Sequence, residues 1–164
     1  MHEAFRALLT APQPLQCVRK RMRSCNLFAV ADACAIELPR FARADGAVVV
    51  AQAAAQVPFD IARMFTLTAP LGSHRGDHAH RRCTQFIVCV HGAVDVSCDD
   101  GANKRIFTLD RSNSAVLVPP TLWNTVIFKQ DQSVVVVLCD RPFEEPDYLR
   151  TYPEFLAFRK AQTS

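Results

Sequence analysis

Two histidines, His78 and His80, are separated by a single residue. Side chains at positions i and i+2 of a β-strand project from the same face, so a strand here would point both imidazoles into one space. An imidazole with its unperturbed pKa of about 6.5 accepts and returns a proton near neutral pH. The pair therefore suits general acid–base catalysis, in which a proton leaves one atom of a bound molecule and returns to another. The alternative is a pair of hydrogen-bonded histidines with a structural role only.

The segment around the pair has the spacing of the first cupin signature: five residues separate Gly72 from His78, and Gly92 closes the segment. In the metal-binding form of that signature a glutamate stands at the position of Gln85, and a second motif supplies a histidine at the position of Asn124. Both amide side chains are neutral and are poor ligands for zinc, iron or manganese. The sequence therefore predicts no bound metal and no redox cofactor, with a metal-dependent cupin as an alternative.

The length of 164 residues suits a single domain with one hydrophobic core. A net charge of +3 is too small to indicate nucleic-acid binding. No apolar run reaches the ~18–20 residues of a membrane span, and Glu3 and Arg6 lie where a signal peptide would be apolar. We therefore expect a cytoplasmic protein without a membrane span. The seven cysteines form no CxxC pair, so neither a disulfide framework nor a zinc knuckle is indicated.

Turn residues separate short apolar segments at intervals of about ten residues, which is typical of a β-sandwich or barrel. The expected elements are a hairpin turning at Asp45-Gly46, strands at 61–67, 85–90, 94–98, 106–109, 115–118, 125–128 and 133–138, and one or two helical turns within 144–158. The strand at 61–67 alternates, with Ile61, Arg63, Phe65 and Leu67 on one face. The strand at 85–90 is almost continuously apolar, so we expect it to be buried on both faces.

Several motifs together carry a resemblance to a known family. They are IELPRF (36–41), VPFDIAR (57–63), RGDHAH (75–80), QFI (85–87), DDG (99–101), PP (119–120) with Trp123, and DYLR (147–150) followed by Tyr152 and EFL (154–156). With them, the stretch 36–158 resembles the sugar 3,4-ketoisomerases, small cupins that act on nucleotide-linked 4-keto-6-deoxy sugars in deoxyaminosugar synthesis. The resemblance covers about three quarters of the chain.

The resemblance implies an all-β, single-domain cupin, a jelly-roll-like barrel over residues 34–158 with a short C-terminal helical segment. Residues 1–33 are then an N-terminal extension, and residues 159–164 are a tail. The extension carries a basic patch within residues 19–23, which we expect to be solvated, with contact to an acidic partner or membrane surface as an alternative. Because the family is usually dimeric, a homodimer is implied.

The implied activity is the conversion of a nucleotide-diphospho, dTDP-linked, 4-keto-6-deoxyhexose to its 3-keto isomer through an enediol, for surface polysaccharides such as lipopolysaccharide O-antigen. His78 is then the base at C3 and His80 the proton shuttle to C4, or the reverse. The alternative from another class is a non-catalytic cupin that binds a sugar nucleotide or serves in assembly.

Six positions are implied to bind the substrate: Arg63, Phe65, Arg75, Gln85, Trp123 and Asn124. Two of them depart from the family pattern. The family has paired tyrosines where this chain has Phe65-Thr66, and an arginine where it has Asn124. A phenol and a guanidinium would bind or polarise the sugar, so both changes alter the expected pocket. Tyr148 and Tyr152 are expected to serve in packing or dimer contacts.

Overall fold

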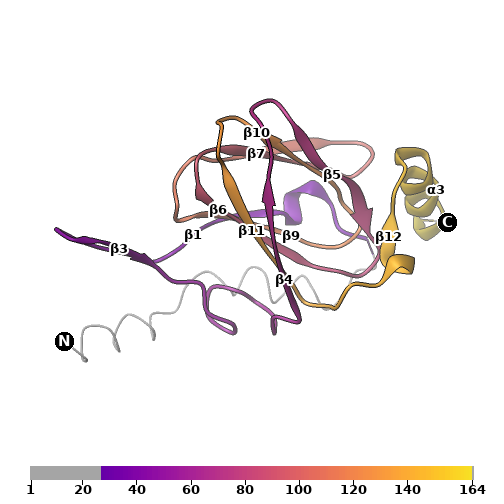
Figure 1. Ribbon diagram of the computed structural model, residues 1–164. Helices are drawn as coiled ribbons and strands as arrows, with labels where there is room; N and C mark the ends of the chain where they lie inside the picture. Colours follow the sequence, from indigo (N-terminus) through magenta and orange to yellow (C-terminus); the bar gives the residue numbers. More distant parts are fainter. Residues whose placement is uncertain (1–26, 164) are drawn as a thin grey trace.

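The computed structural model describes residues 27–163 (Figure 1). The predictions about residues 1–26, including the basic patch, lie outside the described residues. Within them, no helix is both long and apolar enough to cross a membrane.

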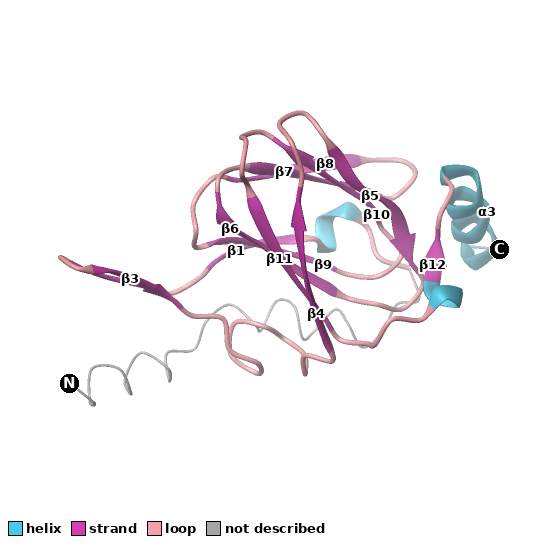
Figure 2. Cartoon of the chain, viewed as in Figure 1, coloured by secondary structure: helices cyan, strands magenta, loops and turns pink. Residues whose placement is uncertain are grey.

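The described chain folds into two antiparallel five-stranded sheets that face each other (Figure 2). The first, called the β6 sheet, has the order β1 (Cys34–Glu37), β9 (Ser114–Val118), β6 (Gln85–His91), β11 (Val134–Cys139) and β4 (Arg63–Thr68). The second, called the β5 sheet, has the order β12 (Tyr148–Leu149), β5 (His74–His80), β10 (Trp123–Phe128), β7 (Val94–Asp99) and β8 (Lys104–Leu109). The predicted all-β cupin fold is confirmed, but the two sheets do not close into a barrel.

Alternating side chains place the main core between the sheets. Val96 and Phe128 from the β5 sheet pack in one buried cluster with Ile87, Val116 and Val137 from the β6 sheet. The opposite face of the β6 sheet is apolar as well. There Phe86, Val88 and Leu117 pack with Leu38 and Val57 from the segment that follows β1. Strand β6 is therefore buried on both faces over most of its length, as its composition predicts.

A separate hairpin of β2 (Arg40–Arg43) and β3 (Gly46–Val49) projects from the sandwich, with its turn beside the predicted Asp45-Gly46 (Figure 1). Strand β4 begins at Arg63, so the prediction that the strand starts at Ile61, on the same face as Arg63, is wrong. Ile61 is 41% exposed and lines a groove on the outside of the β6 sheet. Arg63 and Phe65 do alternate with exposed residues along β4.

Both predicted ends of the folded region are extended by the structure. The C-terminal helix α3 (Tyr152–Thr163) is longer than the expected one or two turns and continues beyond residue 158. Two short 3₁₀ helices, η1 (Val30–Asp32) and η2 (Glu145–Asp147), are the other helices of the described residues. At the other end, Phe28 is buried in the main core. Its backbone N–H donates to Thr121 Oγ1, and its carbonyl accepts from Arg159 on α3. These contacts fix the last residues of the expected extension against the sandwich.

A β-bulge in β5 sets the direction of the histidine pair. Along β10, Asn124 lies opposite His78 but Thr125 lies opposite Gly76, so Asp77 is the extra residue. Gly76 and Asp77 both have positive φ, at 92° and 51°. The Thr125 hydroxyl donates to the Asp77 carboxylate at 2.7 Å, and this bond holds the extra residue on the outside. Bulges re-aim the strand that follows them, here the strand end that carries the imidazoles.

We expect Gly76→Ala to destabilise the fold more than Gly72→Ala. Both glycines have positive φ, but a Cβ at Gly76 would lie 2.9 Å from the Asn124 carbonyl oxygen, whereas a Cβ at Gly72 meets nothing within 4 Å. Gly72→Ala should lose about 1 kcal/mol from backbone strain alone. Gly76→Ala should lose roughly 1–3 kcal/mol more because of the close contact. Urea unfolding measures both, and equal losses would contradict this account of the bulge.

Candidate active site

A polar cluster lies between the sheets at one end of the sandwich, where several strands begin or end together. Strand pairing brings Asn124 opposite His78, and it brings Cys139 opposite both Gln85 and Arg63. The imidazoles of His78 and His80 lie on β5, and the polar side chains around them come from β4, β6, β10 and β11. Elsewhere the inner faces of these strands are apolar, so the polar cluster lies at one end of the hydrophobic core.

The two imidazoles contact each other directly, as their i, i+2 spacing predicts. His78 Nε2 lies 3.2 Å from His80 Nε2, and the rings stand at 87° to each other. His78 Nδ1 lies 2.9 Å from the Gly76 carbonyl oxygen. His80 is 2% exposed, whereas His78 is only partly buried. His78 is therefore the imidazole that a molecule entering from solvent reaches first.

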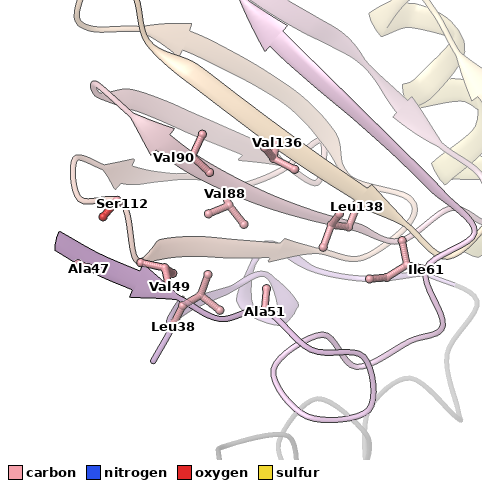
Figure 3. A pocket seen from close by; sticks show the side chains of 10 residues that line it. All are labelled: Leu38, Ala47, Val49, Ala51, Ile61, Val88, Val90, Ser112, Val136 and Leu138. Atoms are coloured by element: carbon pink, nitrogen blue, oxygen red, sulfur yellow. The ribbon is translucent and has the colours of Figure 1, made fainter. Parts of the chain in front are cut away.

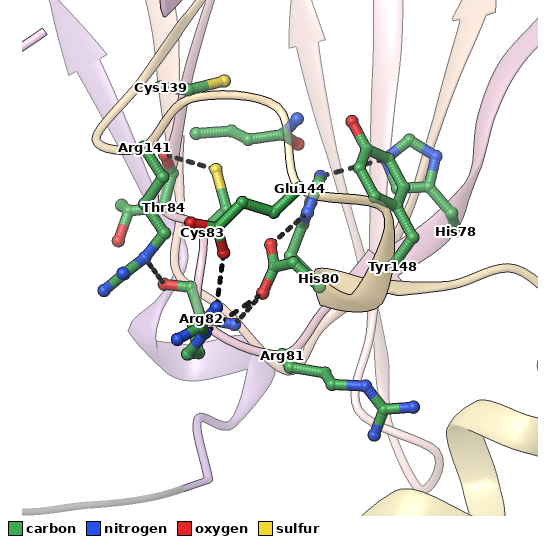
Figure 4. A network of polar contacts seen from close by, with 12 residues as sticks. His78, His80, Arg81, Arg82, Cys83, Thr84, Cys139, Arg141, Glu144 and Tyr148 are labelled. Atoms are coloured by element: carbon green, nitrogen blue, oxygen red, sulfur yellow. Dashed lines mark hydrogen bonds and ion pairs between the residues drawn. The ribbon is translucent and has the colours of Figure 1, made fainter. Parts of the chain in front are cut away.

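Figure 4 shows His78 and His80 beside Tyr148 in a network of polar contacts. Asp147 is a third member of this group, and the sequence did not single it out. Its Oδ2 lies 2.8 Å from His80 Nδ1, and its Oδ1 accepts the Arg82 backbone N–H at 2.7 Å. The carboxylate is 3% exposed. Asp147 ends the short helix η2, which brings it beneath β5 from a point 67 residues later in the chain. It belongs to the DYLR motif, which was the only signal for it in the sequence.

Tyr148 follows Asp147 and lies against both imidazoles. Its ring centroid is 5.0 Å from that of His78 and 4.3 Å from that of His80. Its hydroxyl accepts a hydrogen bond from Arg63 Nη2 at 3.4 Å. On the other side, the Arg150 guanidinium lies 4.3 Å from the Tyr148 ring centroid and pairs with Glu145. The expectation that Tyr148 serves in packing or dimer contacts therefore missed its place beside the imidazoles.

Arg63 connects this tyrosine to a pair of buried thiols. Its guanidinium lies over the Phe65 ring at 5.3 Å and contacts Cys139 Sγ at 3.5 Å. A hydrogen bond from Cys83, and after it the Arg63 guanidinium, lowers the pKa of the Cys139 thiol. Phe65 thus stacks on Arg63 at the position where the family has a tyrosine.

Gln85 and Asn124, which occupy the metal-ligand positions of cupins, bind each other. Asn124 Nδ2 donates to Gln85 Oε1 at 3.3 Å, and both side chains are buried. Among the described residues, the ligand atoms of His80, Cys83 and Asp147 also lie within 4.8 Å of one another. A metal there would have to replace the His80–Asp147 hydrogen bond.

Comparison with known proteins identifies the family of this chain. The family model FdtA, described as WxcM-like, C-terminal, matches residues 31–160. The chain belongs to this family. A TDP-4-oxo-6-deoxy-alpha-D-glucose-3,4-oxoisomerase of Aneurinibacillus thermoaerophilus is 32% identical over 111 residues, which are 67% of this chain and 80% of that relative. The resemblance to sugar 3,4-ketoisomerases is therefore confirmed.

Solved structures show the same fold for members of this kind. The sugar 3,4-ketoisomerase QdtA of Thermoanaerobacterium thermosaccharolyticum, in complex with TDP, has a TM-score of 0.77 at 22% identity, covering 83% of this chain and 100% of that one. A histidine-to-asparagine mutant of QdtA was solved with TDP-4-keto-6-deoxyglucose, with a TM-score of 0.75 at 22% identity, over 79% of this chain and 95% of that one. WlaRA, a TDP-fucose-3,4-ketoisomerase of Campylobacter jejuni, has a TM-score of 0.73 at 20% identity, over 81% of this chain and 99% of that one.

Two of the predicted site residues of this FdtA-family chain lie apart from the imidazoles. Trp123 stands edge-on to Tyr152 at 5.3 Å and packs against Phe155 of α3. It points away from its neighbour Asn124 because successive strand residues alternate. Arg75 is exposed on β5, opposite Val126. The structure therefore places Trp123 and Arg75 outside the group of site residues that it brings together, which are Arg63, Phe65, His78, His80, Gln85 and Asn124.

Burial lowers the pKa of both imidazoles. For His80 the pKa falls to about 4, first because of burial and then because of repulsion by a charge on His78, while the Asp147 hydrogen bond opposes the shift. Once His78 carries a charge, His80 therefore binds a further proton only weakly.

The stability of the protein should fall as the pH drops from about 6.5 toward 4. In this window His80 binds a proton in the unfolded chain but not in the native one, so stability present above pH 6.5 is lost on acidification. The full effect is about 3 kcal/mol. In urea unfolding across this range, His80→Asn should lack this part of the pH dependence. His74→Asn, at an exposed position of the same strand, should keep it, and identical curves for the two variants would contradict the assignment.

Proposed function

We propose that this protein is a sugar-nucleotide 3,4-ketoisomerase acting on a TDP-linked 4-keto-6-deoxyhexose. The observation that carries the proposal is the direct contact of two imidazoles, His78 and His80, at a partly open polar end of the sandwich. The 32% identical relative, named for this isomerisation, supports the substrate class. The proposal includes a cytoplasmic setting, predicted from the sequence, and a role in deoxyaminosugar and surface-polysaccharide synthesis, implied by the resemblance.

The reaction moves two protons and leaves the substrate's electrons within the sugar. The hydrogen on C3 passes to C4, and the hydroxyl proton on O3 passes to O4, by way of an enediol in which C3 and C4 share the double bond. No external oxidant or reductant is needed. Groups that take and return protons are sufficient, which agrees with the proposal that no metal or redox cofactor takes part.

Each side chain near the pair has a proposed part. His78, the more accessible imidazole, takes the proton from C3 and returns it to C4, with His80 behind it. The Tyr148 oxygen accepts from Arg63, so its own proton is available to a substrate oxygen at C4. This tyrosine supplies a phenol at the site although the family's paired tyrosines are replaced by Phe65-Thr66.

The substrate-binding set remains the six positions predicted from the sequence. Arg63 donates to Tyr148, which lies against both imidazoles, and Phe65 packs on Arg63. Asn124 donates to Gln85 and to the His78 carbonyl oxygen. Arg75 and Trp123 stand farther out, where charge and an aromatic face suit a diphosphate and a base. A non-catalytic module that binds the same sugar nucleotide is the second candidate, because the phenylalanine at position 65 removes a family phenol.

Replacing either imidazole should stop isomerisation without unfolding the protein. His78→Asn and His80→Asn each keep a hydrogen-bonding side chain and should lower kcat by ~10²–10⁴, the usual worth of positioned proton transfer. NMR of TDP-4-keto-6-deoxyglucose in D2O would follow both product formation and deuterium uptake at C3. His74→Asn is the matched control and should retain wild-type turnover.

Two outcomes would overturn parts of this proposal. Wild-type protein that binds the sugar but catalyses neither exchange nor isomerisation would favour the binding module. Loss of turnover on treatment with a chelator, restored by one added metal, would refute the metal-free mechanism.

We further propose a homodimer formed through the outer face of the β6 sheet. A groove of about 450 Å³ lies there, lined largely by Val88, Val90, Val136 and Leu138 together with Val49 of the projecting hairpin (Figure 3). The hairpin forms a two-stranded sheet of its own among the described strands, so its edges can pair with a second copy.

Light scattering should give about twice the chain mass of 18.3 kDa. Val90→Asp, which places a charge on the groove, should shift the protein toward monomer. Ile106→Asp changes an equally apolar exposed residue on the β5 sheet and should leave the dimer intact. A monomeric wild type, or equal effects of the two variants, would rule this interface out.

A further inference from the structure

One row of inward side chains crosses β4, β11 and β6 at the polar end of the sandwich. Cys139 on β11 lies directly opposite Arg63 on β4, and it also lies directly opposite Gln85 on β6. Residues directly opposite each other in antiparallel strands project to the same face, with their Cβ atoms about 4.5–5.5 Å apart. The Cys139 side chain is fully buried and belongs to the main core. Cys139 therefore lies between two residues of the predicted substrate-binding set.

The sulfur of Cys139 accepts hydrogen bonds from both sides of this row. From β4, Arg63 Nη2 donates to Sγ at 3.5 Å. The pKa of the thiol is lowered by hydrogen bonds from Cys83, Arg63 and Gln85, so the Gln85 side chain on β6 is a further donor. The Gln85 Oε1 atom already accepts from Asn124 Nδ2 at 3.3 Å, which leaves the amide N–H₂ group to face the sulfur. Without the sulfur, the donors on β4 and β6 would both lose this acceptor.

The Arg63 side chain uses only one of its nitrogens for the hydrogen bonds that the structure shows. Nη2 donates to Cys139 Sγ and to the Tyr148 hydroxyl, at 3.5 and 3.4 Å. The rings of Phe65 and Phe143 lie over the guanidinium at 5.3 and 5.7 Å. Nε is buried, and it is the one buried side-chain nitrogen or oxygen of the described residues that has no partner. An unpaired buried donor is unfavourable, so Nε indicates a partner that the protein itself does not supply.

We propose that Cys139 is a positioning residue, whose sulfur holds Nη2 of Arg63 and leaves Nε of the same guanidinium to donate to an oxygen of the substrate. This inference rests on the proposed ketoisomerase function. When His78 takes the C3 proton, the electron pair of the C3–H bond forms the C3–C4 double bond, and charge develops on the oxygen at C4. Arg63 also orients the Tyr148 hydroxyl, which is proposed to face that oxygen. A donor that is already oriented needs no reorganisation as the charge forms.

Removing the sulfur of Cys139 should impair turnover of TDP-4-keto-6-deoxyglucose. Cys139→Ala should lower kcat by ~10²-fold, the loss that a misplacement of about 1 Å causes. KM should change less, because the charge on the oxygen develops only during the reaction. Cys139→Ser keeps a hydrogen-bond acceptor and should recover most of the loss. Cys89→Ala is the matched control: it removes a sulfur from the same core, one that donates to a backbone carbonyl, and should retain wild-type kcat.

Nitrogen-15 NMR of labelled arginine follows the guanidinium without turnover. The Arg63 Nε–H signal, assigned by its loss in Arg63→Lys, should exchange slowly with water in the wild type because Nε is buried. In Cys139→Ala the exchange should be at least ~10-fold faster, since a guanidinium that is no longer held opens to water more often. Cys139→Ser and Cys89→Ala should keep the slow exchange. Cys139→Val fills nearly the same volume without an acceptor, and it replaces Cys139→Ala in this test if the alanine variant does not fold.

The outcomes separate the positioning role from the proposed activity. Equal exchange of Arg63 Nε–H in the wild type and in the variant without an acceptor overturns the role of the sulfur. Faster exchange with wild-type kcat, or equal losses of kcat in Cys139→Ala and Cys89→Ala, overturns the part in which Nε serves the substrate. A wild type with the expected exchange but no isomerase activity supports the positioning of Arg63 and refutes the proposed function.

Discussion

The buried hydrogen bond between His80 and Asp147 joins the two parts of the molecule on which the site depends. His80 ends strand β5, and Asp147 lies 67 residues later in the segment that leads into α3. The same carboxylate accepts the backbone N–H of Arg82, so it also fixes the turn that follows β5. Removing one partner from such a buried pair leaves the other without its hydrogen bond, which is much more unfavourable than losing an exposed ion pair.

The rest of the fold keeps the His80–Asp147 hydrogen bond away from water. The sandwich has an apolar interior, and its polar groups gather at the end where β4, β6 and β10 begin and β5 and β11 end. In that setting each polar side chain is tied to another: Asn124 to Gln85, Arg63 to Tyr148 and Cys139, His78 to Gly76. Groups already oriented in a partly dry site need little reorganisation when charge develops on a substrate, which is a general source of catalytic power.

Local periodicity predicted the part of this site that lies on regular strands. The i, i+2 spacing of His78 and His80 and the alternation of Arg63 with Phe65 were enough to place these side chains inward. Asp147 and Tyr148 could not be placed in this way, because their positions depend on a short helix and a two-residue strand formed late in the chain. Ile61 was misplaced for a related reason. Ile61 is apolar because it lines the groove on the outer face of the β6 sheet, not because it belongs to the strand. Alternation alone does not show where a strand begins.

The account's central claim is that C3 and C4 of a nucleotide-linked 4-keto sugar lie against His78 inside the sandwich. The most direct measurement is a crystal structure of the His78→Asn variant with TDP-4-keto-6-deoxyglucose. The account predicts that C3 and C4 lie within about 3–3.5 Å of the side chain at position 78, the distance of a productive complex, with the keto oxygen toward Tyr148. A sugar ring held instead in the groove beside Val88 and Val136, or outside the polar cluster altogether, would contradict it.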